Sequence, residues 1–258
     1  MAMKGKICVV TGAGSGIGQA TAVVLARQEA ASIALCDVDE KGLEETKNLC
    51  REYGTTVTTT KVDVSDAEQV DVWLRATSAK FGQIDAAANI AGIAGGAAEL
   101  TESIDQTAWD RMLSVNLTGL MLCMRAEIQH MRQGRGSIVN ISSTSGLRGL
   151  PRNAAYASSK FGVIGLTEST AGEYGKKGIR VNAVLPGPID TKIFRDGEAK
   201  GLFNADIVSA GTLMGRMGRA EEVAKVVVFL LSDEASYVTG ARWTVDGGYS
   251  ACGFYSAG

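Results

Sequence analysis

Short apolar segments alternate along the chain with longer segments in which apolar residues recur at helical spacing. The apolar segments are nearly continuous rather than interrupted at every second residue, which is typical of parallel strands covered on both faces. The expected strands are residues 6–11, 32–36, 56–62, 84–90, 136–141, 179–185 and 243–246. The expected helices are residues 16–30, 40–53, 67–81, 106–132, 154–174 and 221–231.

The order of these elements predicts a single α/β domain. Strand–helix units joined by short links form right-handed crossovers, and their repetition gives a doubly wound parallel sheet with helices on both faces. With about seven strands, this sheet is Rossmann-like. No linker, low-complexity segment or internal repeat interrupts residues 1–258. Residues 190–219 have weak periodicity, several glycines and some aromatic residues, and we expect them to form a substrate lid.

Composition narrows the class of protein. Hydrophobic residues make up 45% of the chain and charged residues 21%, which favours a large core over disorder. The net charge of −2 and the lack of a basic block argue against nucleic acid or an anionic membrane as a partner. No apolar run approaches the ~20 residues needed to span a bilayer. The first apolar segment is also too short for the core of a signal peptide.

Cysteine and histidine usage adds two further expectations. The five cysteines form no C-x-x-C pair, so we expect reduced thiols in a reducing compartment and a cytoplasmic location. His130 is the single histidine, which argues against a metal site built on several histidines and against a Ser-His-Asp triad. We therefore expect no metal.

A glycine-rich segment, Thr-Gly-Ala-Gly-Ser-Gly-Ile-Gly, connects the first expected strand to the first expected helix. Glycines at such a turn let the main chain approach a pyrophosphate, and the helix amino terminus offers unpaired N–H groups with partial positive charge. The strand–turn–helix context supports dinucleotide binding over a merely flexible turn. The candidate cofactor-binding residues of this segment are Gly12, Ser15, Gly16, Ile17 and Gly18.

Asp37 ends the second expected strand, about nineteen residues after Gly18. A carboxylate at this position can accept hydrogen bonds from ribose hydroxyls and would repel a 2′-phosphate. Neither Ser15 nor Val38 brings a cationic side chain to the same place, so NAD(H) is favoured over NADP(H). If Asp37 instead served as a helix N-cap or turn residue, the preference would stay open.

Two further strand ends carry candidate cofactor contacts. Asp63 and Val64 close the third expected strand, where the carboxylate could accept from the adenine amino group or equally cap the next helix. Asn89, Ala91 and Gly92 close the fourth strand, next to the switch point where the crevice of such a sheet lies. Small residues at this edge let a cofactor pass close to the main chain.

The segment Tyr156-Ala157-Ser158-Ser159-Lys160 places a phenol and an ammonium four residues apart, on one face of an expected helix. Free tyrosine titrates near pH ~10, and a neighbouring cation lowers that pKa. Such a phenol can exchange a proton with an alcohol or a ketone near neutral pH. The spacing alone is also compatible with a surface helix that happens to carry both residues.

Together these motifs resemble the short-chain dehydrogenase/reductase family, in its compact single-domain branch. The glycine segment, Asn89-x-Ala91-Gly92, Asn116, Ser143, Tyr156-x-x-x-Lys160 and Pro186-Gly187 have the family's order and spacing over essentially the whole chain. One departure is Ile90, which stands where the family often has a second asparagine.

The resemblance implies a role for each catalytic candidate. Tyr156 would be the acid/base, and Lys160 would lower the pKa of Tyr156 and bind the nicotinamide ribose, so that both residues also contact the cofactor. Ser143 would orient and polarise the substrate carbonyl. The main chain of Asn116 would hold a water next to Lys160, although a buried asparagine bonded within its own helix is the alternative.

The resemblance also assigns the segment after the sixth strand to the nicotinamide carboxamide. Its expected contacts are Pro186, Gly187, Ile189 and Thr191. The segment 245–248 resembles a carboxyl-terminal strand and turn that often lies at a subunit interface, which implies a homotetramer or a homodimer.

The function predicted from these residues is hydride transfer between NAD(H) and a secondary alcohol or ketone. The substrate would lie among residues 94–99, 147–153 and 190–217. An apolar or cyclic substrate is suggested by the apolar residues of the last segment, although these side chains could merely anchor the lid: Phe194, Leu202, Phe203, Leu213 and Met214. The alternatives are an NADPH-dependent 3-oxoacyl-thioester reductase and a non-catalytic dinucleotide-binding module.

Overall fold

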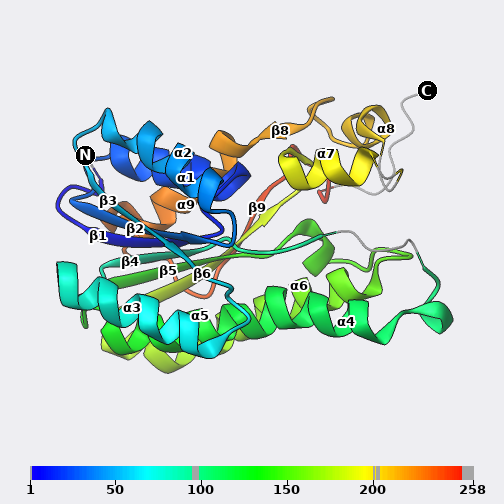
Figure 1. Ribbon diagram of the computed structural model, residues 1–258. Coiled ribbons are helices and arrows are strands. Elements are labelled where there is room, and N and C mark those ends of the chain that lie inside the picture. Colours follow the sequence, from blue (N-terminus) through cyan, green and yellow to red (C-terminus); the bar gives the residue numbers. More distant parts are fainter. Residues whose placement is uncertain (1, 95–98, 200, 202–203, 252–258) are drawn as a thin grey trace.

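A seven-stranded sheet forms the centre of the computed structural model, which describes residues 2–94, 99–199, 201 and 204–251 (Figure 1). Neighbouring strands are all parallel, in the order β3-β2-β1-β4-β5-β6-β9. The order reverses between β1 and β4, and ligands of such sheets bind at this switch point. The strands are β1 (Ile7–Thr11), β2 (Ser32–Asp37), β3 (Thr56–Lys61), β4 (Ala86–Asn89), β5 (Gly136–Ile141), β6 (Ile179–Pro186) and β9 (Arg242–Val245).

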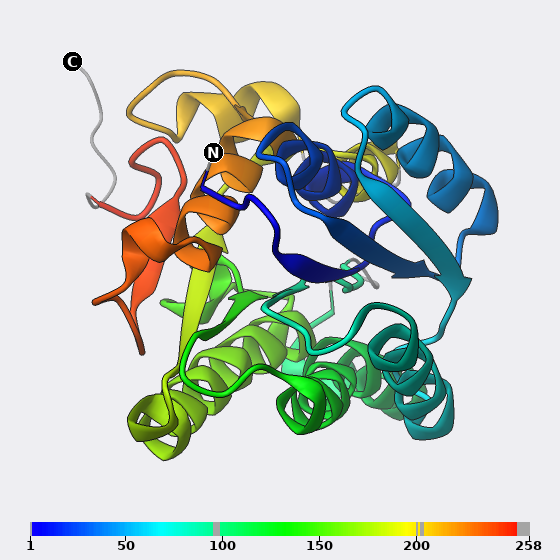
Figure 2. The ribbon, with the colours of Figure 1, turned by 90° about the vertical axis from the view of Figure 1, so that its left-hand side faces the viewer.

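Helices cover both faces of the sheet, as Figures 1 and 2 show from two directions. One layer consists of α1 (Gly16–Arg27), α2 (Glu40–Arg51) and α9 (Ala220–Leu231). The other consists of α3 (Ala67–Phe81), α4 (Gln106–Leu113), α5 (Leu120–His130) and α6 (Ala154–Tyr174). The predicted doubly wound α/β fold is therefore confirmed.

In the described residues the core consists of two large apolar clusters, one on each side of the sheet, and a small third one of Ile164, Ala183 and Leu185. In β1, Cys8 and Val10 belong to one cluster, whereas Val9 belongs to the other. Successive side chains of a strand point to opposite faces, so a strand between two helical layers buries every residue. This arrangement explains why the central strands have continuous apolar sequences, whereas the edge strands β3 and β9 are partly exposed.

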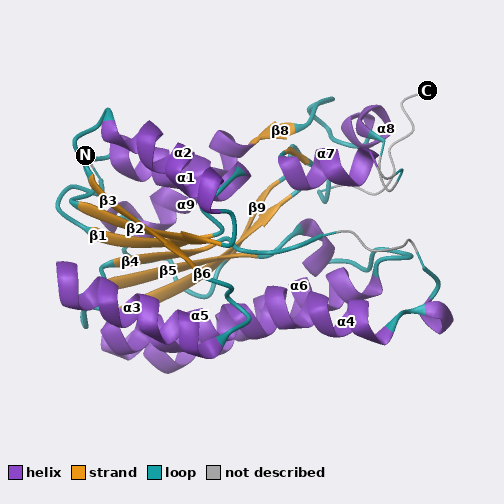
Figure 3. Ribbon diagram, in the orientation of Figure 1, coloured by secondary structure: helices purple, strands orange, loops and turns teal. Residues whose placement is uncertain are grey.

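Two segments differ from the expectations from sequence. The helix expected over 106–132 is divided, because a π-helical turn at Ser114–Gly119 separates α4 from α5. The segment expected to be irregular, 190–219, contains the helices α7 (Lys192–Ala199) and α8 (Ala205–Ala210) (Figure 3). These helices are too short to show clear apolar periodicity. The strands β7 (Ile189–Asp190) and β8 (Gly218–Arg219) form a separate parallel pair at the ends of this segment.

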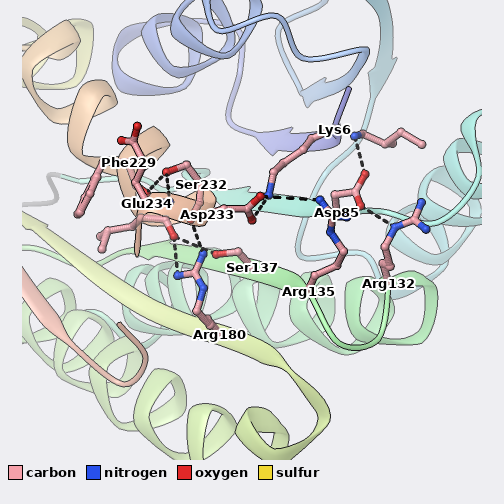
Figure 4. Close-up of polar contacts among 12 residues, drawn as sticks. Lys6, Asp85, Arg132, Arg135, Ser137, Arg180, Phe229, Ser232, Asp233 and Glu234 are labelled. Atoms are coloured by element: carbon pink, nitrogen blue, oxygen red, sulfur yellow. Dashed lines mark hydrogen bonds and ion pairs between the residues drawn. The ribbon is translucent and has the colours of Figure 1, made fainter. Parts of the chain in front are cut away.

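The carboxyl terminus of α9 is held by charged side chains at the amino-terminal edge of the sheet (Figure 4). The Arg180 guanidinium donates to the main-chain oxygens of Leu230, at 2.7 Å, and Ser232, at 2.9 Å. Lys6 is 4% exposed, and its Nζ lies 2.7 Å from the Asp233 carboxylate. Helix carbonyls that lack partners within the helix are satisfied in this way by cations.

Replacing Arg180 should destabilise the fold. We expect Arg180→Met to lower the free energy of unfolding by about 2 kcal/mol, because carbonyls at the end of α9 lose charged donors. Arg135→Met is the matched control, since Arg135 is exposed and its guanidinium lies 3.8 Å from the Asp233 carboxylate. The control should change stability by less than about 0.5 kcal/mol. Urea denaturation of both variants measures this difference, and equal losses would contradict the assignment.

Candidate active site

The glycine loop between β1 and α1 lies directly on the main chain that follows β4. Gly12 has a φ of +67°, and a Cβ built on it would lie 2.7 Å from the Cα of Ala91. A Cβ on Gly18 would lie 2.0 Å from the Gly12 carbonyl oxygen. The Ser15 side chain makes no capping hydrogen bond at the start of α1. The N–H groups of the first turn are thus left for an anion such as a pyrophosphate.

Asp37 faces this loop from the end of β2. Its carboxylate accepts from the N–H groups of Gly14, at 2.8 Å, and Asp39, at 3.0 Å. Asp39, rather than Asp37, is the N-cap of α2, which it caps by accepting from the N–H of Gly42. Asp37 therefore combines a turn role with a carboxylate at the glycine loop, and the neighbouring Val38 is exposed.

Asp63 also lies in a turn, at the end of β3. Its carboxylate accepts from the main-chain N–H of Ser65, at 2.9 Å, and from the Ser65 hydroxyl, at 2.6 Å. Asp66 is the N-cap of α3, so the alternative that Asp63 caps this helix is wrong. Val64 is buried and lies against Gly119. Adenine binding by this turn stays a prediction.

Asn89 directs its side chain into the protein interior. Its Nδ2 donates to Glu127 Oε2, at 3.0 Å, and to Asn140 Oδ1, at 3.1 Å. Asn140 in turn donates to the Thr167 hydroxyl, at 2.9 Å. The network joins β4, β5, α5 and α6 below the site. The Asn89 side chain is therefore engaged inside the protein, and a cofactor contact of this residue stays a prediction.

Glu127 is a titratable residue that the sequence analysis missed. It is fully buried, and burial raises the pKa of its carboxyl from 4.5 to about 7. The sequence signal that could have revealed this burial is the position of Glu127 one turn after Cys123, on the apolar face of α5.

The raised pKa of Glu127 should make stability depend on pH. The folded protein holds this proton more tightly than the unfolded chain, so stability falls as pH rises from about 4.5 to about 7, by about 3 kcal/mol. We expect Glu127→Gln to remove this contribution, so that stability between pH 5 and pH 8 changes less than in the wild type. Urea denaturation at the two pH values tests this. Glu173→Gln, which changes an exposed carboxylate, should leave the difference unaltered.

Asn116 lies in the π-helical turn between α4 and α5, an irregularity that often marks functional sites. Its side chain accepts from the Ile93 N–H, at 2.8 Å, and donates to the Ile93 carbonyl, at 2.9 Å. It also donates to the Ser159 hydroxyl, at 3.2 Å. The Asn116 side chain thus fixes the chain after Gly92 against α6. The predicted role of its main chain is not tested by these contacts.

Ser143, Tyr156 and Lys160 meet where β5 ends and α6 begins. Ser143 follows β5, accepts from the Ser145 N–H at 3.1 Å, and forms a side-chain hydrogen bond with Tyr156. Lys160 is 4% exposed, and its Nζ donates to the Ile141 carbonyl at 3.1 Å. The same Nζ lies 5.6 Å from the centroid of the Tyr156 ring. The three predicted catalytic side chains therefore form one cluster.

Desolvation dominates the pKa values of this cluster. Burial raises the pKa of Tyr156, and the hydrogen bond with Ser143 opposes the rise. Burial lowers the pKa of Lys160 to about 8. The predicted lowering of the Tyr156 pKa by Lys160 is absent from this structure, where the ammonium lies over the ring and is itself desolvated. A lowered tyrosine pKa needs more positive charge beside the phenol.

The segment after β6 closes the site from the other side. A Cβ on Gly187, which follows Pro186, would lie 2.6 Å from Asp246 Cβ. A Cβ on Gly16 would lie 3.4 Å from Thr191 Cγ2, so Thr191 stands over the glycine loop. Ile189 is buried. The glycine loop and the segment after β6, both predicted to bind the cofactor, thus lie next to each other.

The segment expected to be the lid lines an open hollow of about 430 Å³. Its lining includes Phe194 and Met217 but none of the catalytic side chains. Leu213 and Met214 are exposed instead, at 61% and 63%. Leu202 and Phe203, like residues 95–98, lie outside the described residues.

Two kinds of feature are absent from the described residues. In this part of the chain, no helix combines the length and apolar character that a membrane crossing requires. Nor do the described residues bring three or more His, Cys, Asp or Glu side chains together as a metal site.

Comparison with known proteins places this site in a family. A family model described as enoyl-(acyl carrier protein) reductase matches residues 12–250. Short-chain dehydrogenase/reductase aba4 from Botryotinia fuckeliana (strain B05.10) is 43% identical over 250 residues, which cover 95% of this chain and 96% of that protein. The chain belongs to the short-chain dehydrogenase/reductase family.

Two further relatives of this short-chain dehydrogenase/reductase are named after their substrates. Levodione reductase from Leifsonia aquatica is 42% identical over 255 residues, covering 95% of this chain and 94% of that protein. Cis-4-hydroxycyclohexanecarboxylate dehydrogenase from Sinomonas cyclohexanicum is 42% identical over 250 residues, covering 95% and 97%. A crystal structure of levodione reductase superposes with a TM-score of 0.92 at 40% identity, covering 97% of this chain and 100% of that chain.

Members of this family bind a nicotinamide dinucleotide, and the site fits such a ligand. Glycines leave no room for a side chain where the loop meets β4, and the first turn of α1 is uncapped by Ser15. The carboxylate of Asp37 and the methyl group of Thr191 flank the loop.

Proposed function

We propose that this short-chain dehydrogenase/reductase transfers hydride between NAD(H) and a secondary alcohol or ketone, with Tyr156 as the acid/base. The observation that carries the proposal is the cluster of Ser143, Tyr156 and Lys160, next to a glycine loop that fits a dinucleotide. When bound, the nicotinamide supplies or accepts the hydride.

The proton transfer follows from the contacts of the cluster. During oxidation Tyr156 takes the hydroxyl proton of the substrate, and during reduction it returns a proton to the carbonyl oxygen. Ser143, which is bonded to the phenol, donates to the same oxygen and orients it. Lys160 carries positive charge below pH about 8, with its Nζ 5.6 Å from the centroid of the Tyr156 ring. An oxidised nicotinamide would add a second positive charge and favour the phenolate.

NAD(H) is the proposed cofactor because the Asp37 carboxylate lies against the glycine loop. The hydrogen bonds from Gly14 and Asp39 hold this negative charge in place, where it would meet a 2′-phosphate. An NADPH-dependent acyl-thioester reductase would have to accommodate that repulsion.

An apolar or cyclic ketone or alcohol is the proposed substrate class. Two relatives bear names of compounds with six-membered rings, levodione and hydroxycyclohexanecarboxylate. Leu147, four residues after Ser143, is 37% exposed, and Leu213 and Met214 in the proposed lid are more exposed still. These side chains offer an apolar surface to a ring.

We also infer that the protein is a cytoplasmic homotetramer or homodimer. In the described sheet β9 is an edge strand that pairs with β6 alone, and Arg242 and Thr244 on it are exposed. Such an edge is open to a second copy. The buried free thiols of the described cysteines support a reducing compartment: Cys8, Cys36, Cys50 and Cys123.

Removing the Tyr156 hydroxyl should abolish turnover without abolishing cofactor binding. We expect Tyr156→Phe to lower kcat for ketone reduction by about 10²–10⁴-fold, because the proton donor is lost. The Kd for NADH, measured by fluorescence titration, should change little. Tyr174→Phe, on the same helix, is the control and should keep normal turnover. Normal turnover by Tyr156→Phe would refute the mechanism.

The charge of Asp37 should decide the choice of cofactor. We expect Asp37→Asn to lower the ratio of kcat/KM for NADH to that for NADPH by about tenfold or more, because the repulsion of a 2′-phosphate is removed. The assay compares both cofactors with a cyclic ketone, a secondary alcohol and a 3-oxoacyl thioester. Asp39→Asn removes a neighbouring charge but retains an N-cap residue, so its ratio should match the wild type. A wild-type preference for NADPH and the thioester would favour the alternative function.

A further inference from the structure

The turn that follows β9 is held by hydrogen bonds to Asp246 and carries the ring of Tyr249. The two carboxylate oxygens of Asp246 accept from the N–H groups of Gly248, at 3.0 Å, and Ser250, at 2.9 Å. Gly247 and Gly248 have φ values of +59° and +79°, a conformation that side chains disfavour. Sequence and main-chain geometry therefore fix this turn, residues 246–250, which we call the Tyr249 turn.

The Tyr249 turn contacts the proposed lid. A Cβ built on Gly211, the C-cap residue of α8, would lie 3.1 Å from Tyr249 Cε2, so the ring packs on the main chain of the proposed lid. The N–H of Met214 donates to the Gly247 carbonyl at 3.1 Å. The lid is thus bound to the Tyr249 turn by packing and by a main-chain hydrogen bond.

The same turn contacts the two segments that carry the chemistry. The Arg148 guanidinium donates to the Tyr249 carbonyl at 3.2 Å and lies 4.9 Å from the centroid of its ring. Arg148 lies five residues after Ser143 on the same loop. On another side, Gly187 lies against Asp246 with no space for a side chain. Lid, catalytic loop and the segment after β6 therefore converge on one turn.

Apolar side chains stay exposed around this convergence. Leu147, which precedes Arg148, is 37% exposed, and Leu213 and Met214 are exposed at 61% and 63%. Leu213 lies against Gly248 of the turn. Exposed apolar side chains gathered near one turn are typical of ligand sites, and an aromatic face suits an apolar ring.

We propose that Tyr249 determines substrate specificity: its ring holds the lid against the loop that carries Ser143 and forms the wall on which the ring of a cyclic ketone packs. The inference rests on the proposed function and names the residue that selects its substrate. The main-chain carbonyl of Tyr249, rather than its hydroxyl, accepts from Arg148, so the aromatic face is the part that the selection requires.

The test compares cyclohexanone with 2-butanone in steady-state assays with NADH. We expect Tyr249→Ala to lower kcat/KM for cyclohexanone by about tenfold or more, mainly through KM, and to change kcat/KM for 2-butanone by less than about threefold. Tyr249→Phe should stay within about twofold of the wild type for both ketones, because it retains the ring. The Kd for NADH and the oligomeric mass should be unchanged in both variants.

A matched pair of glycine variants tests the same wall without altering Tyr249. In Gly211→Ala the new Cβ would press on the ring at 3.1 Å, so KM for cyclohexanone should rise severalfold. Gly172→Ala is the control, since a Cβ there meets no described atom within 4 Å. This pair decides the question if Tyr249→Ala does not fold.

Three results would overturn the inference: equal losses for both ketones in Tyr249→Ala, an equal loss in Tyr249→Phe, or a loss that accompanies dissociation of the oligomer. The last result would make the turn a subunit contact. Failure of the proposed function is distinguishable, because the wild type would then reduce neither ketone with either cofactor.

Discussion

Direct contact between main chains at the carboxyl-terminal edge of the sheet is the constraint on which the rest of the structure depends. Gly12 lies against Ala91, and Gly18 lies against the carbonyl of Gly12, with no space for a Cβ at either glycine. These contacts bring β1, α1 and the end of β4 together. The amino terminus of α1, which no side chain caps, therefore lies at the switch point. Gly187 repeats the arrangement against Asp246, on the far side of the site.

Below this edge the protein buries polar groups in two layers. In the upper layer Asn116 clamps the main chain of Ile93, and Lys160 donates to a carbonyl of β5. In the lower layer Glu127 and Asn89 join α5 to β4. Burial costs free energy for each of these groups unless hydrogen bonds satisfy it. The same burial lowers the pKa of Lys160 and raises the pKa of Glu127, which favours the neutral form of both side chains. The site is therefore held in position by buried polar groups whose desolvation costs free energy.

Much of the fold was predictable, because strands between two helical layers have continuous apolar sequences and the glycine loop occurs where a strand meets a helix. The π-helical turn around Asn116 was not, since one extra residue in a turn leaves the apolar pattern of a long helix nearly unchanged. Glu127 was missed because a carboxylate on an expected helix is normally solvated. The short helices α7 and α8 lack the length that periodicity requires.

The sequence by itself determined the order of strands and helices, the glycine loop, and the spacing that places Tyr156 and Lys160 on one helix face. These features depend on local chain geometry and on residue spacing. Tertiary structure alone decided that Ser143 bonds Tyr156, that Glu127 is fully buried, and that the turn carrying Tyr249 contacts both Gly211 and Arg148. Those contacts join residues far apart in the chain, and burial, hydrogen bonding and pKa shifts exist only once the chain has packed.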